Sequence, residues 1–169
     1  MNDFSADVRL AQQGSSEAFS RLYAKVYKDM YHIALYSLRS SHDASDAVSE
    51  TVLDAFCSIK KLKKPESFRG WIMKILSAKI KKIQRNYFEV PDELKEDTSI
   101  NEFDFESVEL RESIEKLDTG SRLLLSMSVL GGYSSDEISE ICNIKASTVR
   151  ARLSAIKKVL RLQLTPDVP

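Results

Sequence analysis

The sequence is poor in the residues that build turns, disulfides and metal sites. It holds 5 glycines and 4 prolines in 169 residues, which disfavours a turn-rich all-β architecture. The 2 cysteines, Cys57 and Cys142, fall at apolar positions of helical patterns, so we expect small buried side chains rather than a disulfide framework. The 2 histidines, His32 and His42, stand apart from other ligand types. We therefore expect no metal site and no cofactor.

The sequence also lacks the features of a membrane protein or an enzyme. No apolar run approaches the roughly 18 residues that span a bilayer, and the first residues, MNDFSADVRLAQQG, show no basic-then-apolar signal pattern. We find no nucleophile–base pair and no glycine-rich phosphate loop. These absences favour a non-enzymatic cytoplasmic protein with no small-molecule substrate. A hydrophobic fraction of 43% and a charged fraction of 30% are typical of a helical globular protein.

The net charge is zero, but the charges are segregated along the chain. Residues 1–88 hold 15 Lys and Arg against 9 Asp and Glu, and residues 119–169 hold 7 against 4. Residues 89–118 between them hold 3 against 12. Because exposed charges act over a Debye length of roughly 8–10 Å, local rather than net charge decides how a surface meets a polyanion. Neutrality therefore does not exclude nucleic-acid binding.

Hydrophobic spacing near 3.6 residues predicts an all-α protein with two small helical domains. We expect helices over 1–13, 16–38, 41–59 and 68–86 in a first domain, residues 1–87. An acidic linker, residues 88–107, follows. The acidic block of residues 89–118 could also cover the basic surfaces within the same molecule. A second domain, residues 108–169, is predicted to hold helices near 108–117, 123–130, 134–142 and 148–162.

The helix expected over residues 41–59 carries an acidic ridge opposite its apolar side. Asp43, Asp46, Glu50 and Asp54 recur at steps of three and four residues, with no basic partner at helical spacing inside the helix. Such a ridge is either a solvated face or a docking surface for a basic partner.

The segment from Lys60 to Arg85 is the most basic part of the chain. It contains ten Lys and Arg residues and one acid, Glu66, with Phe68 and Trp71 among them. A solvated helix face usually mixes charges of both signs. The one-sided charge beside aromatic rings therefore favours contact with phosphates and bases over a merely solvated face.

Residues 134–162 have the pattern of a helix-turn-helix. Ser134 and Glu137 fit the S-x-x-E capping box, and Asn143 stands where a left-handed turn residue is needed. The outward positions at the start of the second helix are polar or basic, which indicates a recognition helix for DNA. A generic helical hairpin could share the apolar spacing, so the outer face carries the DNA interpretation.

In their order and separation these segments resemble a bacterial RNA polymerase sigma factor of the extracytoplasmic-function type, in the sigma-70 family. The matching stretches are EAFSRLYAKVYKDMYHIAL, DASDAVSETVLDAF and SFRGWIMKIL, then IEKLDTGSRLLLSMSVLGGYSSDEISEICNIKASTVRARLSAIKKVL. Family members carry region two and region four, two helical domains on a flexible linker. The resemblance implies promoter-specific initiation with RNA polymerase core, through its β′ clamp helices and β flap, and possible control by an anti-sigma factor.

The resemblance also assigns roles to residues. The implied contacts with core polymerase are Asp43, Asp46, Glu50 and Leu53. The implied readers and melters of the minus-ten promoter element are Lys60, Lys61, Lys63, Lys64, Phe68, Trp71, Lys74 and Lys81. The implied contacts with the minus-thirty-five element are Lys145, Ser147, Thr148, Arg150, Ala151, Arg152 and Ser154.

The chain departs from the family pattern at several positions, including Ser49, Ala78, Lys82, Asp118 and Ser147, so no promoter sequence is implied. Two alternatives stay open. The chain could be a helix-turn-helix regulator without sigma activity, or a sigma-like accessory or decoy protein that binds polymerase or an anti-sigma factor.

Overall fold

The computed structural model describes the backbone of residues 3–88 and 108–164 and the side chains of residues 3–85 and 112–161. All regular elements in these ranges are helices, so the predicted all-α class is confirmed. The expected acidic linker lies almost wholly outside them. The α-helices are α1 (Ser5–Gln12), α2 (Ser16–Leu38), α3 (Ser41–Ser58), α4 (Phe68–Phe88), α5 (Val108–Glu115), α6 (Thr119–Val129), α7 (Ser135–Cys142) and α8 (Ala146–Leu164).

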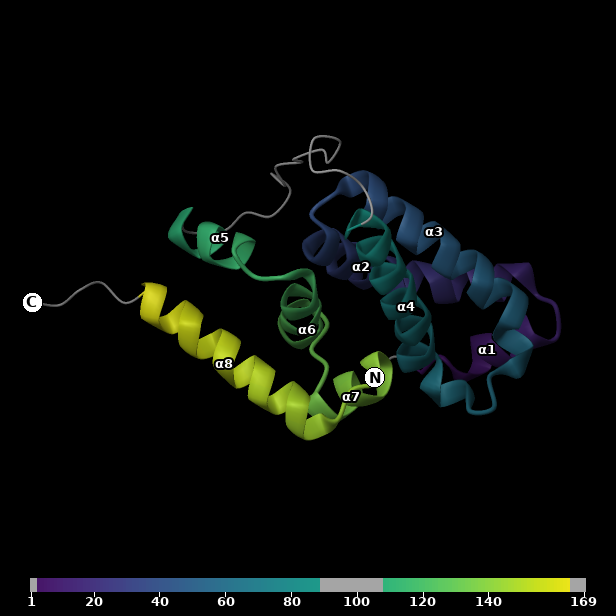
Figure 1. Ribbon diagram of the computed structural model, residues 1–169. Helices are drawn as coiled ribbons and strands as arrows, with labels where there is room; N and C mark the ends of the chain where they lie inside the picture. Colours follow the sequence, from purple (N-terminus) through teal and green to yellow (C-terminus); the bar gives the residue numbers. More distant parts are fainter. Residues whose placement is uncertain (1–2, 89–107, 165–169) are drawn as a thin grey trace, which may run out of the picture.

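The N-terminal half packs α1, α3 and α4 around α2 (Figure 1). The buried side chains of α2 follow the predicted stripe, among them Phe19, Leu22, Val26 and Met30. The helix begins at Ser16, and the residue before it, Ser15, is its cap, because the Ser15 hydroxyl accepts a hydrogen bond from the Ala18 amide at 3.1 Å. Short 3₁₀ turns, Ile59–Lys61 and Pro65–Ser67, connect α3 to α4.

The C-terminal half contains the predicted helix-turn-helix in α7 and α8. The Ser134–Glu137 capping box is present. Asn143 follows α7 with φ 54° and ψ 48°, the left-handed conformation that Asn tolerates. Helix α6 begins at Thr119, before the expected start, because the Asp118 carboxylate accepts from the Ser121 amide at 2.7 Å. Asp118, one of the departures from the family pattern, is therefore a helix cap.

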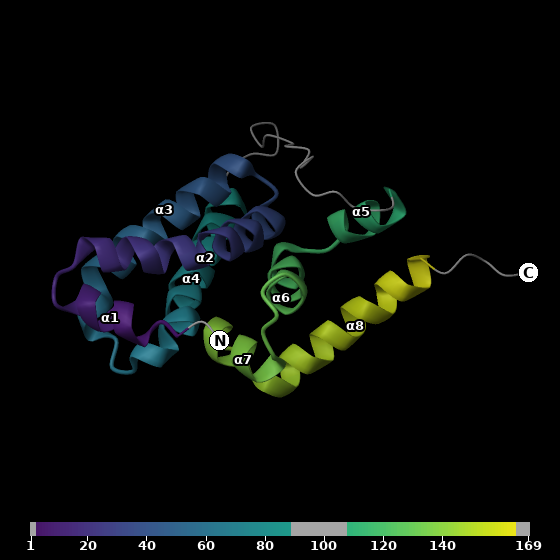
Figure 2. The same cartoon turned by 180° about the vertical axis from the view of Figure 1, so that it is seen from behind.

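The two halves pack directly against each other. In Figures 1 and 2, α6 and α7 lie against α2 and α4, and α8 extends away beneath α5. One buried apolar cluster runs from Val8 and Leu22 in the first half to Met127 and Ile138 in the second. A smaller cluster joins Tyr36 of α2 to three side chains of the other half, Ile114, Leu125 and Ile156. The sequence left this packing undetermined.

The two cysteines differ in exposure. Cys142 is buried as predicted, at the contact between the halves. Cys57 is exposed, so its predicted burial is wrong. It lies one helical turn beyond Leu53, which is 65% exposed, on the outward face of α3.

Candidate functional site

The acidic ridge of α3 lies at the surface. The side chains of Asp46 and Glu50 are 57% and 53% exposed, and Leu53 lies between them and the end of the helix. Asp43, in the first turn, is half-buried. An exposed apolar side chain next to carboxylates suits a partner that offers basic and apolar groups together.

The ridge has a basic neighbour that the helical pattern of α3 could not reveal. Lys79 of α4 lies 2.7 Å from the Asp54 carboxylate and 3.6 Å from that of Glu50. The hydrogen bond with Asp54, together with the nearby charge of Glu50, raises the Lys79 pKa above its usual value. Lys79 therefore offsets part of the ridge charge at one edge and leaves Asp46 facing solvent, with His42 3.5 Å away.

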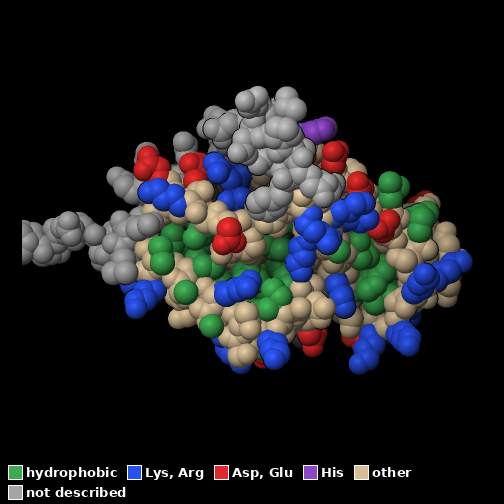
Figure 3. All heavy atoms as spheres, in the orientation of Figure 1, with side chains coloured by type: hydrophobic (Ala, Val, Ile, Leu, Met, Phe, Trp, Pro, Cys, Tyr) green, Lys and Arg blue, Asp and Glu red, His purple; other side chains and the backbone are tan. Residues whose placement is uncertain are grey.

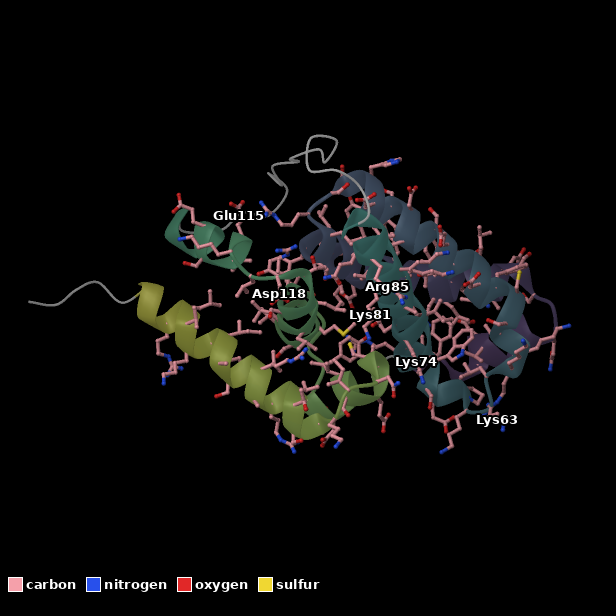
Figure 4. All side chains as sticks on the ribbon, in the orientation of Figure 1. Lys63, Lys74, Lys81, Arg85, Glu115 and Asp118 are labelled. Atoms are coloured by element: carbon pink, nitrogen blue, oxygen red, sulfur yellow. The ribbon has the colours of Figure 1, made fainter. Side chains whose placement is uncertain are left out.

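The lysines expected to meet the minus-ten element occupy the turns before α4 and positions along that helix. The exposed members are Lys60, Lys61, Lys63, Lys64 and Lys74. Figure 4 places Lys63 in the turns and Lys74, Lys81 and Arg85 along α4, and Figure 3 shows basic side chains on the same face. These charges form an open cationic surface. We call the exposed lysines the basic surface.

Phe68 does not lie on the basic surface. Its side chain is 0% exposed, and its ring centroid lies 5.6 Å from that of Phe4 and 6.0 Å from that of Trp71. In this arrangement a base cannot reach the Phe68 ring, because core side chains surround it. Trp71 is half-buried and keeps part of its indole at the surface.

Lys81, which the resemblance implies as a reader of the minus-ten element, is not among the exposed lysines. Its ammonium donates a hydrogen bond to the Cys142 carbonyl oxygen at 2.7 Å, at the end of α7. The side chain is half-buried between α4 and α7. It is therefore occupied by the opposite half of the molecule.

The recognition helix α8 presents its outer face as predicted from its pattern. The exposed positions are Lys145, Ser147, Arg150, Ala151, Arg152 and Ser154. Thr148 is half-buried. Arg150 makes an exposed ion pair with Asp136 of α7 at 3.3 Å, which contributes little to stability and can exchange for a phosphate. Val149 and Leu153 face inward.

Two arginines at the contact between the halves were not predicted as functional residues. Arg69 donates to the Gly131 carbonyl at 2.6 Å, and its guanidinium lies 4.4 Å from the Tyr133 ring centroid. Arg122 of α6 is 8% exposed and donates to the Ser37 carbonyl at 3.2 Å. An arginine directly before three leucines, as in SRLLLS, was a weak signal that one apolar face also buries a charge.

A cleft of about 530 Å³ opens between the two halves at the start of α4. One wall carries Arg69, Trp71 and Lys74, and the other carries Tyr133 and two acids of α7, Glu137 and Glu140. The candidate minus-ten residues thus face carboxylates across this cleft.

Burial shifts the pKa values of two side chains at the contact between the halves. It lowers the Arg122 pKa to about 10, with the nearby positive charge of Arg39 adding to the effect. It raises the Tyr133 pKa to about 12, against the opposing effect of Arg69. The Tyr133 hydroxyl is buried and has no hydrogen-bond partner among the described residues. The contact therefore contains polar groups whose burial costs free energy.

No helix within residues 3–88 and 108–164 is long and apolar enough to cross a membrane. The same part of the chain contains no group of three or more His, Cys, Asp or Glu side chains that could hold a metal ion.

Two family models match the chain. The model "Sigma-70 region 2" matches residues 22–86, and the model "Sigma-70, region 4" matches residues 107–160. These matches cover α2 to α4 and α5 to α8 almost completely, in the order of the two halves.

Similar proteins and structures agree with these models. RNA polymerase sigma factor SigV of Bacillus subtilis (strain 168) is 26% identical over 144 residues, 83% of this chain and 87% of that protein. ECF RNA polymerase sigma factor SigW of the same organism is 25% identical over 177 residues, 93% and 94% of the two chains.

Among solved structures, CnrH in complex with the cytosolic domain of CnrY has a TM-score of 0.73 at 20% identity and covers 99% of this chain and 100% of that one. The sigma factor RpoE in complex with the anti-sigma factor NepR from Bartonella quintana has a TM-score of 0.72 at 16% identity, with 89% and 98% covered. At these identities the two structures establish a shared fold.

Proposed function

We propose that three surfaces of this chain share the task of starting transcription at promoters. The chain belongs to the extracytoplasmic-function type of the sigma-70 family and is therefore a sigma factor that directs transcription initiation. The ridge on α3 binds core polymerase, the basic surface with α4 acts on the minus-ten element, and α8 reads the minus-thirty-five element. The chain acts by binding, in the cytoplasm, and catalyses no bond chemistry itself.

The exposed face of α3 suits a partner that offers basic and apolar side chains together. Asp46 and Glu50 present carboxylates beside Leu53, which leaves most of its apolar side chain in water. A basic helical partner gains both charge complementarity and apolar burial there. We propose that this partner is the β′ clamp helix pair, and that the C-terminal half rests on the β flap.

The basic surface and Trp71 support action on an opened strand. Promoter melting requires preferential binding of unstacked bases, so that the unstacking cost of a few kcal/mol is offset. Lys60, Lys61, Lys63, Lys64 and Lys74 supply phosphate contacts, and the exposed part of Trp71 supplies a stacking surface. Phe68 is left out of this proposal because its ring lies in the core.

The observation that carries the proposal is the exposed N-terminal part of α8. Arg150 and Arg152 project there from a helix held by the capped α7 and the Asn143 turn, which is how a recognition helix enters a major groove. The regulator and decoy alternatives are not favoured, because resemblance to sigma factors extends over both halves.

We also propose an anti-sigma factor as a regulatory partner. Two solved structures with this fold are complexes, one with the cytosolic domain of CnrY and one with the anti-sigma factor NepR. The exposed apolar and acidic face of α3 is a surface for which such a partner and polymerase could compete.

Reconstituted transcription tests the proposed function. Purified core polymerase with this protein should initiate from a discrete set of genomic promoters, and core alone should not. Core binding without initiation at any promoter would favour the decoy. Tight binding to duplex DNA without core affinity would favour the regulator.

A further inference from the structure

One side chain of α1 holds the loop that carries most of the basic surface. The Gln12 side-chain amide donates to the Ile59 carbonyl oxygen at 3.0 Å and to the Leu62 carbonyl oxygen at 2.8 Å. A side-chain amide nitrogen carries two protons, so both donors of Gln12 are used. The two acceptors flank Lys60 and Lys61, which complete the turn that begins at Ile59. The backbone under these two lysines is therefore fixed on both sides.

The loop between α3 and α4 has reason to spread without such a hold. Four of the five lysines of the basic surface lie in it, namely Lys60, Lys61, Lys63 and Lys64. Like charges within a short segment repel one another and favour extended, varied conformations. The hydrogen bonds that the loop makes to itself are local, from the Leu62 amide to the Ile59 carbonyl at 3.1 Å and from the Ser67 amide to the Lys64 carbonyl at 2.9 Å. The buried side chains of Ile59 and Leu62 anchor the loop, and Gln12 fixes the backbone between these two anchors.

Gln12 is itself held in place by the packing of α1. It is half-buried at the last position of the helix, whose Val8 and Ala11 side chains are buried. The Asp7 carboxylate, one face further along α1, accepts from Arg21 of α2 at 2.8 Å. Figure 1 shows α1 lying against the turns that connect α3 to α4. The loop is thus held by a helix that precedes residue 22, where the match to the region 2 model begins.

From these contacts we infer that Gln12 is a positioning residue for promoter DNA, which sets the α3–α4 loop in the conformation in which its lysines meet the phosphates of the opened strand. This inference rests on the proposed role of the basic surface. A loop that is fixed before binding loses less conformational entropy when the strand binds, so the same lysines bind the strand more tightly. Helix α1 therefore takes part in promoter binding without contacting DNA.

Replacing the Gln12 amide tests the inference. Gln12→Met keeps an unbranched side chain and removes both donors. The probe is a fluorescein-labelled oligothymidylate of about 12 nucleotides, and fluorescence anisotropy of the probe with the full chain measures binding. We expect the affinity to fall about fivefold. The slope of log affinity against log salt should stay the same, because every lysine is retained. Lys63→Met, which removes a cation, should instead lower that slope by about 0.7.

The neighbouring residue offers a matched control. Gln13 is exposed, so Gln13→Met removes the same chemical group one position away and should leave the affinity unchanged. Ile33→Val trims a fully buried side chain in the second half of α2 and controls for a general loss of stability. It too should leave the affinity unchanged.

A second substitution reverses the polarity of the contact. In Gln12→Glu the carboxylate cannot donate, and its oxygens repel the two carbonyl oxygens that Gln12 now binds. We expect a larger loss of affinity than in Gln12→Met. Gln13→Glu adds the same charge at the exposed neighbouring position and measures the effect of that charge alone.

Hydrogen exchange reports on the loop without DNA. The Leu62 amide donates within the turn that Gln12 holds. We expect this amide to exchange severalfold faster in Gln12→Met than in wild type, as measured by nuclear magnetic resonance. In Gln13→Met and Ile33→Val it should exchange at nearly the wild-type rate.

The outcomes separate this inference from the proposed function. Wild-type affinity in Gln12→Met, an equal loss in Ile33→Val, or unchanged exchange of the Leu62 amide overturns the positioning role and leaves the proposed function standing. Equal affinities of Gln12→Glu and Gln13→Glu do the same. If the wild-type chain starts no transcription with core polymerase, the proposed function fails. The oligonucleotide and exchange measurements then still decide the inference, since neither uses polymerase.

Discussion

The ammonium of Lys81 lies 2.7 Å from the Cys142 carbonyl oxygen, although 61 residues separate the two in the sequence. Cys142 is the last residue of α7, and Asn143 turns the chain toward α8 immediately after it. The turn that orients the recognition helix is therefore also the place where α4 is held. This relationship couples the two proposed promoter-reading elements.

Replacing Lys81 tests that coupling. We expect Lys81→Met to lower the free energy of unfolding by about 1 kcal/mol, because a charge-assisted hydrogen bond to a helix end is lost from a half-buried site. Urea denaturation followed by circular dichroism measures the change. Lys74→Met, at an exposed position of the same helix, should leave stability nearly unaltered. Equal effects of both substitutions would contradict the structural role of Lys81.

Phe68 should behave as a core residue and not as a base-stacking residue. Its complete burial predicts that Phe68→Ala costs about 3–5 kcal/mol of folding free energy. Phe56, which is 54% exposed, provides the matched control, and Phe56→Ala should cost far less. Thermal or urea denaturation distinguishes the two. A stable Phe68→Ala protein with impaired promoter melting would restore the original interpretation.

Reversing the charge of the α3 ridge should weaken polymerase binding. The double substitution Asp46→Lys and Glu50→Lys removes two exposed carboxylates, and we expect core affinity to fall at least tenfold, about 1.4 kcal/mol, with the fold retained. Fluorescence anisotropy of a labelled chain with core polymerase measures this. Glu17→Lys, also exposed but on α2, serves as the control. Unchanged affinity would remove the ridge from the proposed interface.

Arg150 and Arg152 should contribute phosphate or base contacts through α8. The double Arg→Ala variant should bind a minus-thirty-five duplex more weakly, and the slope of log affinity against log salt should fall by up to about 2, one for each lost phosphate contact. Arg9→Ala, exposed on α1, controls for total charge. The same affinity and slope in wild type and variant would mean that another face of α8 meets DNA.

The burial of the Tyr133 hydroxyl predicts two effects on the free energy of unfolding, one at pH 7 and one at alkaline pH. Because it is buried without a described partner, Tyr133→Phe should raise the free energy of unfolding at pH 7 by about 1 kcal/mol. The folded pKa of about 12 exceeds the ordinary value of 10, so above pH 10 the unfolded chain loses the proton first. Wild-type stability should then fall between pH 10 and 12, by on the order of 2 kcal/mol.

Chemical denaturation at pH 7, 10 and 11 measures both effects, and the Tyr133→Phe variant should lose less stability than wild type over that interval. Identical pH profiles would mean that the hydroxyl is solvated when folded.

Much of the helical architecture followed from local patterns. The Ser134–Glu137 capping box and the left-handed Asn143 were predicted because both depend on neighbouring residues alone. The apolar stripe of α2 was predicted for the same reason, since a period near 3.6 residues marks one buried face. The start of α6 was placed too late, because Asp118 caps it where the family usually has Pro.

The sequence predicted which residues lie together on a surface, but it did not predict which residues elsewhere in the fold contact them. Spacing placed Asp46, Glu50 and Asp54 on one face of α3, yet it could not show that Lys79 of α4 lies beside Glu50 and Asp54. Basic composition marked Lys81 as a cation, but its partner is a main-chain carbonyl, and a carbonyl leaves no signature in a side-chain pattern.

The order of elements, the family and the exposed recognition helix follow from the chain of residues, because helical periodicity and capping act over a few positions. The packing of the two halves, the burial of Phe68 and the hydrogen bonds from Arg69, Lys81 and Arg122 to main-chain carbonyls of the opposite half required the folded molecule. These features depend on contacts between residues about 60 or more positions apart, where hydrophobic burial and charge–carbonyl geometry are decided jointly by both halves.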